Sequence, residues 1–355
     1  MTDTDTKTRR SETMAPRQLE GFSREMLHEF LRKMLLYRRF EEVAEEAYAT
    51  GKIGGFCHLH IGQEAVAHGV VGPLRPDDYV ITSYRDHTQP LAKGADPGAV
   101  LAELYGKAGG SVGGKGGSMH IFHTDLGFMG GHGIVGGQIP LATGIGWAIR
   151  YRGTDQICVC CLGDAAVNQG SFLESLNMAA VWKLPVIYIV ENNEYGMGTA
   201  FSRVSALPVA ERSAGTGVPG HAVDGQDVMA TWRLVERLAA EVRRGSGPQY
   251  VDVRTYRFEG HSMSDPASGT YRTREEVEER KTEADPIKVL RDRLFDAGML
   301  AEEELGEIDR EVREILAEAR AFAEASPVPT ADELYTHTYA QENARGRLFL
   351  DGRDR

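Results

Sequence analysis

Three short segments in the middle of the chain that read as strands alternate with segments of helical periodicity, and this pattern constrains the fold more than any other feature. The predicted strands lie at 156–162, 185–193 and 249–258, and the helical segments lie at about 170–182 and 228–244. Strands joined through helices form parallel sheets, because each helix carries the chain back to the starting edge. We therefore predict an α/β fold with a parallel sheet flanked by helices, and one more strand at 79–85.

Helices are also predicted outside this central pattern. Ser23 is a typical N-cap for a helix that ends near Gly51 and carries the apolar face Leu27, Phe30, Leu31, Met34 and Leu35. Towards the C-terminus, Asp285 and Pro286 open one helix. A later helix carries the apolar stripe Leu305, Ile308, Val312, Ile315, Ala319 and Phe322. We predict a disordered tail at 1–22, one α/β domain with helical extensions at 23–340, and a C-terminal tail at 341–355.

Residues 106–137 are so rich in glycine that we predict a loop, followed by a helix from beyond Pro140 to about Tyr151. Two motifs in this loop resemble nucleotide-binding sequences. "GGSVGGKG" lacks the Ser or Thr that follows the lysine of a phosphate-binding P-loop, and no apolar strand precedes it. "GHGIVG" matches the dinucleotide pattern, but the residues before it do not read as a strand, and Asp155 lies in a turn. Both are weaker alternatives.

Composition argues against several classes of function. A net charge of −12 disfavours nucleic-acid binding, which needs clustered Lys and Arg. The sequence has no run of 18 apolar residues, so no membrane span is predicted. The first 20 residues are polar and lack a signal-peptide core, so we expect a cytoplasmic location. Cys57, Cys158, Cys160 and Cys161 are expected to be reduced, and the last three to be small core residues. His58 and His60 lack further zinc ligands at a usual spacing.

Two of the predicted strands end in polar residues. Asp164 follows the run 156–162, and Asn192 and Asn193 end the next, with 26 residues between Ala165 and Asn192. That length fits one crossover helix and a return strand, so both polar ends emerge at the edge where open α/β sheets bind ligands. A carboxylate, an amide oxygen and a loop carbonyl suit Mg²⁺ that also holds phosphate oxygens. A helix opening after Asp164 would direct its N–H groups at the same anion.

The glycine before Asp164 and the spacing to the asparagines match the metal and diphosphate motif of thiamine-diphosphate enzymes. From about Ser23 to about Tyr339 the chain resembles the alpha subunits of the decarboxylating component of pyruvate dehydrogenase. The stretches that carry the resemblance are "GFCHLHIGQEA", "TSYRDH", "GKGGSMH", "GGHGIVGGQIPLATG", "NMAAVWKLPVIYIVENNEYGMGT" and "EGHSMSDP…TYRTREE". The implied fold is the thiamine-diphosphate-binding α/β fold with a helical C-terminal extension.

The resemblance also implies roles for individual residues. Asp164, the side chain of Asn193 and the backbone carbonyl of Tyr195 would hold Mg²⁺ on the diphosphate. The other cofactor contacts would be Tyr84, Arg85, Gly133, Val135, Ala165, Ala166, Met197 and His261. Gly133 and Val135 would contact the aminopyrimidine through their main chains, and Met197 would lie under the bend of the cofactor. His58 and His261 would be the catalytic residues at the substrate end.

The activity implied by the resemblance is oxidative decarboxylation of pyruvate, with transfer of the acetyl group to a lipoyl arm of a partner acyltransferase. The implied assembly has two alpha and two beta chains, and the beta chain supplies a glutamate that this chain lacks. Branched-chain 2-oxo acids and acetoin are alternative substrates. An inactive assembly subunit and a dinucleotide-dependent dehydrogenase are alternatives of other classes.

Two positions depart from the pattern of the family, and a third matches a regulatory site. Ala165 stands where the metal motif usually has glycine, and Thr88 stands where glycine often follows "YRDH". Both departures bear on the fine geometry of the cofactor site. Ser262 matches a regulatory phosphorylation position of animal relatives, and its simplest role is a hydrogen bond within its loop.

Overall fold

The centre of the fold is a six-stranded sheet in the order β2-β1-β3-β4-β8-β7, in which every neighbouring pair is parallel. This computed structural model describes residues 19–336. The strands are β1 (Tyr79–Ser83), β2 (Phe128–His132), β3 (Cys158–Gly163), β4 (Val186–Asn192), β7 (Gly220–Asp224) and β8 (Gln249–Arg254). The predicted α/β class and parallel sheet are confirmed.

Alternating residues of the strands pack into two separate cores. In β3, Val159 and Cys161 face a core shared with α2 (Arg24–Ala49), α3 (Glu64–Val71) and α8 (Val228–Arg243). Cys158 and Cys160 point the other way, against α6 (Gln138–Arg152) and α7 (Gly170–Val181). At β3 and β4 the sheet is therefore a middle layer buried on both faces, which explains why these two strands read as almost unbroken apolar runs, whereas the edge strand β7 is partly exposed.

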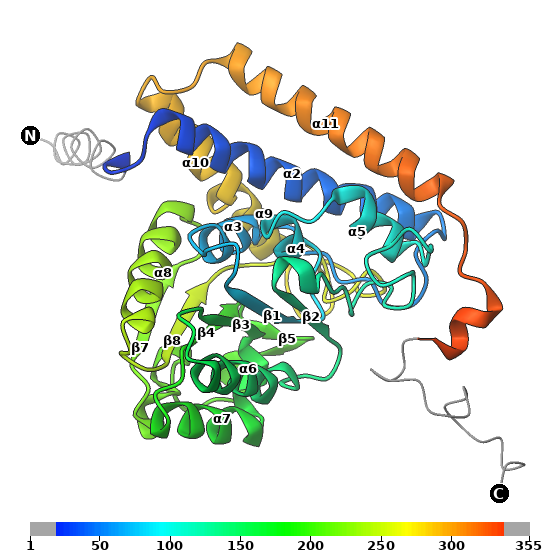
Figure 1. Ribbon diagram of the computed structural model, residues 1–355. Coiled ribbons are helices and arrows are strands. Elements are labelled where there is room, and N and C mark those ends of the chain that lie inside the picture. The colour runs from blue at the N-terminus through cyan, green and yellow to red at the C-terminus, as the bar shows by residue number, and fades with distance from the viewer. Residues whose placement is uncertain (1–18, 337–355) are drawn as a thin grey trace, which may run out of the picture.

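The two longest helices, α2 and α11 (Glu302–Ala325), lie on the same side of the sheet. Figure 1 shows α2, α10 (Pro286–Asp296) and α11 together on one side, and α6 and α7 on the other. The remaining helices are α4 (Thr88–Ala92), α5 (Pro97–Leu104) and α9 (Arg274–Glu283). The predicted caps are confirmed, because the Ser23 hydroxyl accepts from the Met26 N–H and Asp285 accepts from the Ile287 N–H. Leu19, which lies within the predicted N-terminal tail, is buried in the core.

The predicted stripe on the last helix is partly wrong. Its buried residues are Ile308, Val312, Leu316, Ala319 and Ala323, whereas Ile315 and Phe322 are exposed. The helix packs on α2 and α5 along positions four and three residues apart. An apolar residue one position off that line faces solvent, so periodicity alone did not separate Leu316 from Ile315.

The glycine-rich segment is not wholly a loop, because β2 lies inside it at the edge of the sheet. Gly130 has φ +93°, and a Cβ there would lie 2.3 Å from the Phe122 ring. A Cβ on Gly131 would lie 1.9 Å from the Asp86 carboxylate. The glycines therefore permit close packing while the backbone still pairs with β1. The expectation that no strand precedes "GHGIVG" was wrong for this reason.

Two other details differ from the prediction. The helix expected beyond Pro140 begins at Gln138, and a short 3₁₀ turn, Asp164–Asn168, stands where a helix was expected to open after Asp164. The helix predicted at about 170–182 is confirmed as α7. The tail residues 1–18 and the predicted tail 341–355 lie outside the described residues. Within residues 19–336, no helix has the length and apolar character needed to span a bilayer.

Candidate active site

A cavity of about 250 Å³ opens at the carboxyl edge of the sheet. The chain runs from β1 to β2 on one side and returns through α6 to β3 on the other, so the β1–β3 boundary is the point where the strand order reverses. Ligands of open α/β sheets bind at such a switch point. The predicted residues that line the cavity are Tyr84, Arg85, Val135, Asp164, Ala165, Ala166, Asn193, Tyr195, Met197 and His261.

Three oxygens in this cavity come from the residues predicted to hold a metal. Arg257 donates from one guanidinium nitrogen to the Asn193 side-chain oxygen at 3.0 Å and to the Tyr195 carbonyl at 2.7 Å. Asp164 is buried, and its Oδ2 has no hydrogen-bond partner within the described structure. Burial raises the pKa of Asp164 to about 6. A cation already bridges two of the oxygens, and the orphaned carboxylate oxygen beside them suits a hard divalent cation.

Arg85 and Arg257 are buried cations whose hydrogen bonds go to neutral oxygens. Arg85 donates to the Leu59 carbonyl and, at 2.8 Å, to the His261 carbonyl. Arg257 also donates to the Met197 carbonyl and the Tyr271 hydroxyl. Burial, with repulsion from Arg257, lowers the pKa of Arg85 to about 10. A buried charge is unfavourable unless it is paired, so the two guanidinium groups favour the binding of an anion such as a diphosphate in the cavity.

His58 and His261 meet beside Tyr84 at one end of the site. The ring centroids of His58 lie 4.5 Å from Tyr84 and 5.1 Å from His261. Burial and the nearby Arg85 lower the pKa of His58 to about 2 and that of His261 to about 4. Both imidazoles are therefore neutral at pH 7, and Nδ1 of His58 is buried without a partner among the described residues. Neutral imidazoles can donate or accept a hydrogen bond to a small ligand.

Glu191 is a cavity residue that the sequence interpretation missed. It is the last residue but one of β4, contacts His60 at 3.3 Å and accepts from the Gln89 amide at 2.9 Å. Thr88 bonds to the other ring nitrogen of His60 at 2.9 Å. Thr88 in place of glycine therefore takes part in a buried network that holds Glu191, and His60 lies in that network instead of beside His58.

Met197 and Ala165 have backbone and packing constraints that suit a tight ligand site. Met197 has φ +51° and an exposed side chain in the cavity, and its carbonyl is held by Arg257. A non-glycine residue in this region is strained and needs such support. Ala165 is absent from the positive-φ residues, and a Cβ on Gly196 would lie 2.6 Å from the Ala165 methyl group. Glycine is therefore required at 196 and not at 165.

The motif that resembles a P-loop binds a carboxylate of its own chain. The buried Glu103 accepts from four backbone N–H groups, those of Val112, Gly114, Gly116 and Gly117, at 2.7–3.2 Å. Lys115 pairs with Glu333 at 2.8 Å. The N–H groups that would hold a phosphate are thus committed to Glu103. Asp155, considered for a ribose, forms an exposed ion pair with Arg75 just before β3, at the opposite edge of the sheet from the cavity.

Comparison with known proteins identifies the family to which the chain belongs. Residues 32–332 match the family model described as dehydrogenase E1 component. The chain belongs to the dehydrogenase E1 component family. The pyruvate dehydrogenase E1 component subunit alpha of Rhizobium meliloti is 51% identical, covering 89% of this chain and 90% of that protein. The subunit of the same name from Zymomonas mobilis is 49% identical over 88% of each chain, and the somatic mitochondrial form from Rattus norvegicus is 45% identical over 88% of this chain and 79% of its own.

In this dehydrogenase E1 chain, all but two of the predicted site residues line the cavity. His58 contacts the rings of Tyr84 and His261, which line the cavity, and Gly133 lies near His120, where an added Cβ would be 3.2 Å from the ring. Arg257 and Glu191 were missed, although each carried a signal: a charged residue within an aromatic or apolar run. Ser262 is buried and bonds to the Ser264 hydroxyl at 2.9 Å, as its simplest role predicted.

Proposed function

We propose that this chain is the alpha subunit of a thiamine-diphosphate- and Mg²⁺-dependent pyruvate dehydrogenase, which decarboxylates pyruvate and passes the acetyl group to a lipoyl arm of a partner acyltransferase. The observation that carries the proposal is the set of Asp164, Asn193 and Tyr195 oxygens beside two buried guanidinium groups at the strand ends. The choice of pyruvate is supported by the names of relatives that align with about nine-tenths of the chain.

Different residues of the site would bind different parts of the cofactor. Asp164, Asn193 and the Tyr195 carbonyl would hold Mg²⁺, and Arg85 and Arg257 would neutralise the diphosphate. Thiamine diphosphate, when bound, supplies the electron sink that makes loss of CO₂ possible. The remaining cofactor contacts would come from Tyr84, Gly133, Val135, Ala165, Ala166, Met197 and His261.

His58 and His261 would hold the substrate at the far end of the cavity. Because both rings are neutral at pH 7, they can donate a hydrogen bond to a keto-acid oxygen without adding charge. Arg85 is bonded to the backbone of Leu59 and of His261, so it fixes the positions of both histidine-bearing loops. The same guanidinium would attract the carboxylate of the substrate.

The proposal includes an assembly of two alpha and two beta chains. The packed helices α6 and α7, with the residue that follows α7, expose several large apolar side chains: Leu141, Trp147, Tyr151, Leu173, Met178, Val181 and Trp182. An exposed patch of this kind typically marks a protein interface. A partner chain would also supply the glutamate that thiamine catalysis requires. We place the assembly in the cytoplasm, which the four reduced, buried cysteines support.

The test is turnover by this chain with its partner beta chain, measured on pyruvate, 2-oxoisovalerate and acetoin with a lipoyl-bearing acceptor. We expect pyruvate to have the highest kcat/KM, and activity to require both thiamine diphosphate and Mg²⁺. A preference for 2-oxoisovalerate or acetoin would overturn the substrate. Stabilisation by NAD⁺ and not by thiamine diphosphate in a thermal shift assay would overturn the cofactor.

A further inference from the structure

Gln63, which is not among the residues that line the cavity, contacts the Asn193 side chain. The Asn193 amide nitrogen donates to the Gln63 side-chain oxygen at 3.1 Å. Gln63 is fully buried at the residue before α3, and 130 positions separate the two residues in the chain. We propose that Gln63 is a positioning residue, which turns the Asn193 amide so that its oxygen faces the cation site. This inference rests on the proposed function.

The hydrogen-bond inventory fixes the orientation of both amides. Arginine can only donate, so the Asn193 atom that faces Arg257 is its oxygen, and its NH₂ group must face Gln63. Gln63 must then present its own oxygen to that NH₂ group. This arrangement leaves the Gln63 nitrogen buried without a partner among the described residues. The bond to Asn193 therefore sets the orientation of Gln63, even though it leaves this donor unpaired, since the flipped amide would turn its NH₂ group towards that of Asn193.

Arg257 cannot by itself orient Asn193 once a metal is present. Its guanidinium donates to the Asn193 oxygen and the Tyr195 carbonyl, the two neutral oxygens that a divalent cation would use. The guanidinium and the divalent ion are both cations, so they compete for these atoms. Gln63 contacts the other end of the amide and does not compete. Groups behind a metal ligand typically set its orientation and the affinity of the site.

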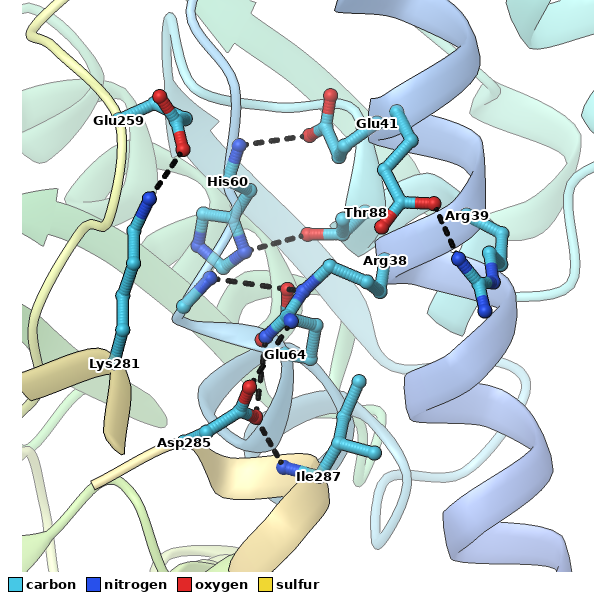
Figure 2. A network of polar contacts seen from close by, with 12 residues as sticks. Arg38, Arg39, Glu41, His60, Glu64, Thr88, Glu259, Lys281, Asp285 and Ile287 are labelled. Atoms are coloured by element: carbon cyan, nitrogen blue, oxygen red, sulfur yellow. Dashed lines mark hydrogen bonds and ion pairs between the residues drawn. The ribbon is translucent and has the colours of Figure 1, made fainter. Parts of the chain in front are cut away.

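The backbone on both sides of Gln63 is held rigidly. Gly62 has φ +94°, and an added Cβ would lie 2.5 Å from the Tyr256 carbonyl, next to Arg257 in the chain. The buried Glu64 accepts from the Gly62 N–H at 3.0 Å and pairs with Arg38 of α2 at 2.6 Å. Figure 2 shows this network, in which Arg38 also reaches Asp285 at the start of α10. Three helices therefore hold the short segment that presents Gln63.

The test compares Mg²⁺ dependence in matched variants of the full chain assembled with its partner. Calorimetry with thiamine diphosphate, over a range of MgCl₂ concentrations, gives the half-saturating Mg²⁺ concentration. Gln63→Met keeps the size and removes the oxygen, and we expect it to raise this concentration about 10- to 100-fold. Gln63→Glu keeps an acceptor and should stay within about threefold of the parent. Gln249→Met removes a buried amide that bonds to His221, outside the cavity, and should have no effect.

The same substitution in an Asn193→Asp variant distinguishes loss of the Asn193 orientation from a general loosening of the site. A carboxylate has two equivalent oxygens and needs no fixed orientation, so in the Asn193→Asp background Gln63→Met should change the Mg²⁺ requirement by less than about threefold. Equal penalties in both backgrounds, or no penalty in the parent, would overturn the role of Gln63. Asp164→Ala tests the site itself: if it leaves the Mg²⁺ dependence intact, the proposed ligand set is wrong. If only Asp164→Ala has an effect, the ligand set stands and Gln63 is not a positioning residue.

Discussion

Replacing Asp164 by asparagine is expected to change the stability of the metal-free chain and its function in opposite directions. Asp164 is buried with one oxygen unpaired, and burial raises its pKa from 3.8 to about 6. The ionised carboxylate is therefore a cost to the folded chain when no metal is bound. Asparagine removes that charge, and with it the carboxylate ligand proposed for Mg²⁺.

The size and sign of the effect follow from the two pKa values. Because the folded pKa is the higher one, the penalty is absent below pH 3.8, grows as the pH rises, and levels off above about pH 6. The penalty is about 3 kcal/mol at pH 7 and roughly half of that at pH 5. The contacts that asparagine makes contribute equally at both pH values and cancel. Asp164→Asn should therefore gain about 1 kcal/mol of stability relative to the parent between pH 5 and pH 7.

Urea denaturation of the full-length chain, stripped of metal with EDTA, measures this difference at the two pH values. The parent serves as the control at each pH. Calorimetry on the partner-bound chain should show that Asp164→Asn no longer binds thiamine diphosphate in an Mg²⁺-dependent manner. A relative stability that stays constant or falls between pH 5 and pH 7 would refute the argument that the carboxylate is buried at a cost. Retained Mg²⁺-dependent binding would remove Asp164 from the ligand set.

Three further outcomes are expected. The chain purified without its partner should show no turnover on pyruvate, and robust activity alone would contradict the assembly. Ala165→Gly should change cofactor affinity by less than about 1 kcal/mol, whereas Gly196→Ala, which brings a Cβ to 2.6 Å from the Ala165 methyl group, should weaken it at least tenfold by calorimetry, about 1.4 kcal/mol. Glu103→Gln, which removes the charge that four backbone N–H groups share, should cost about 2–3 kcal/mol in urea denaturation, and an unchanged midpoint would argue against that anchor.

Much of the candidate site could be predicted because its key residues lie where local patterns change. Asp164 and Asn193 stand where apolar runs end, and the ends of parallel strands meet at one edge of the sheet. The motif resemblance then assigned Tyr84, Arg85 and Met197, which all line the cavity. Neither route could show that Arg257 bridges the Asn193 and Tyr195 oxygens, because that contact joins segments about 60 residues apart in the chain.

The sequence by itself determined the class of the fold, since apolar runs broken by amphipathic segments can bury their faces only as a parallel sheet between helices. It also determined that two of the strands end in polar residues. Only the tertiary structure decided that the glycine-rich segment contains β2. Glycine is needed in this strand because the Phe122 ring and the Asp86 carboxylate lie so close to the backbone that a Cβ would collide with them. Tertiary structure likewise decided the partner of Gln63, since a buried amide takes its role from the group that folding places opposite it.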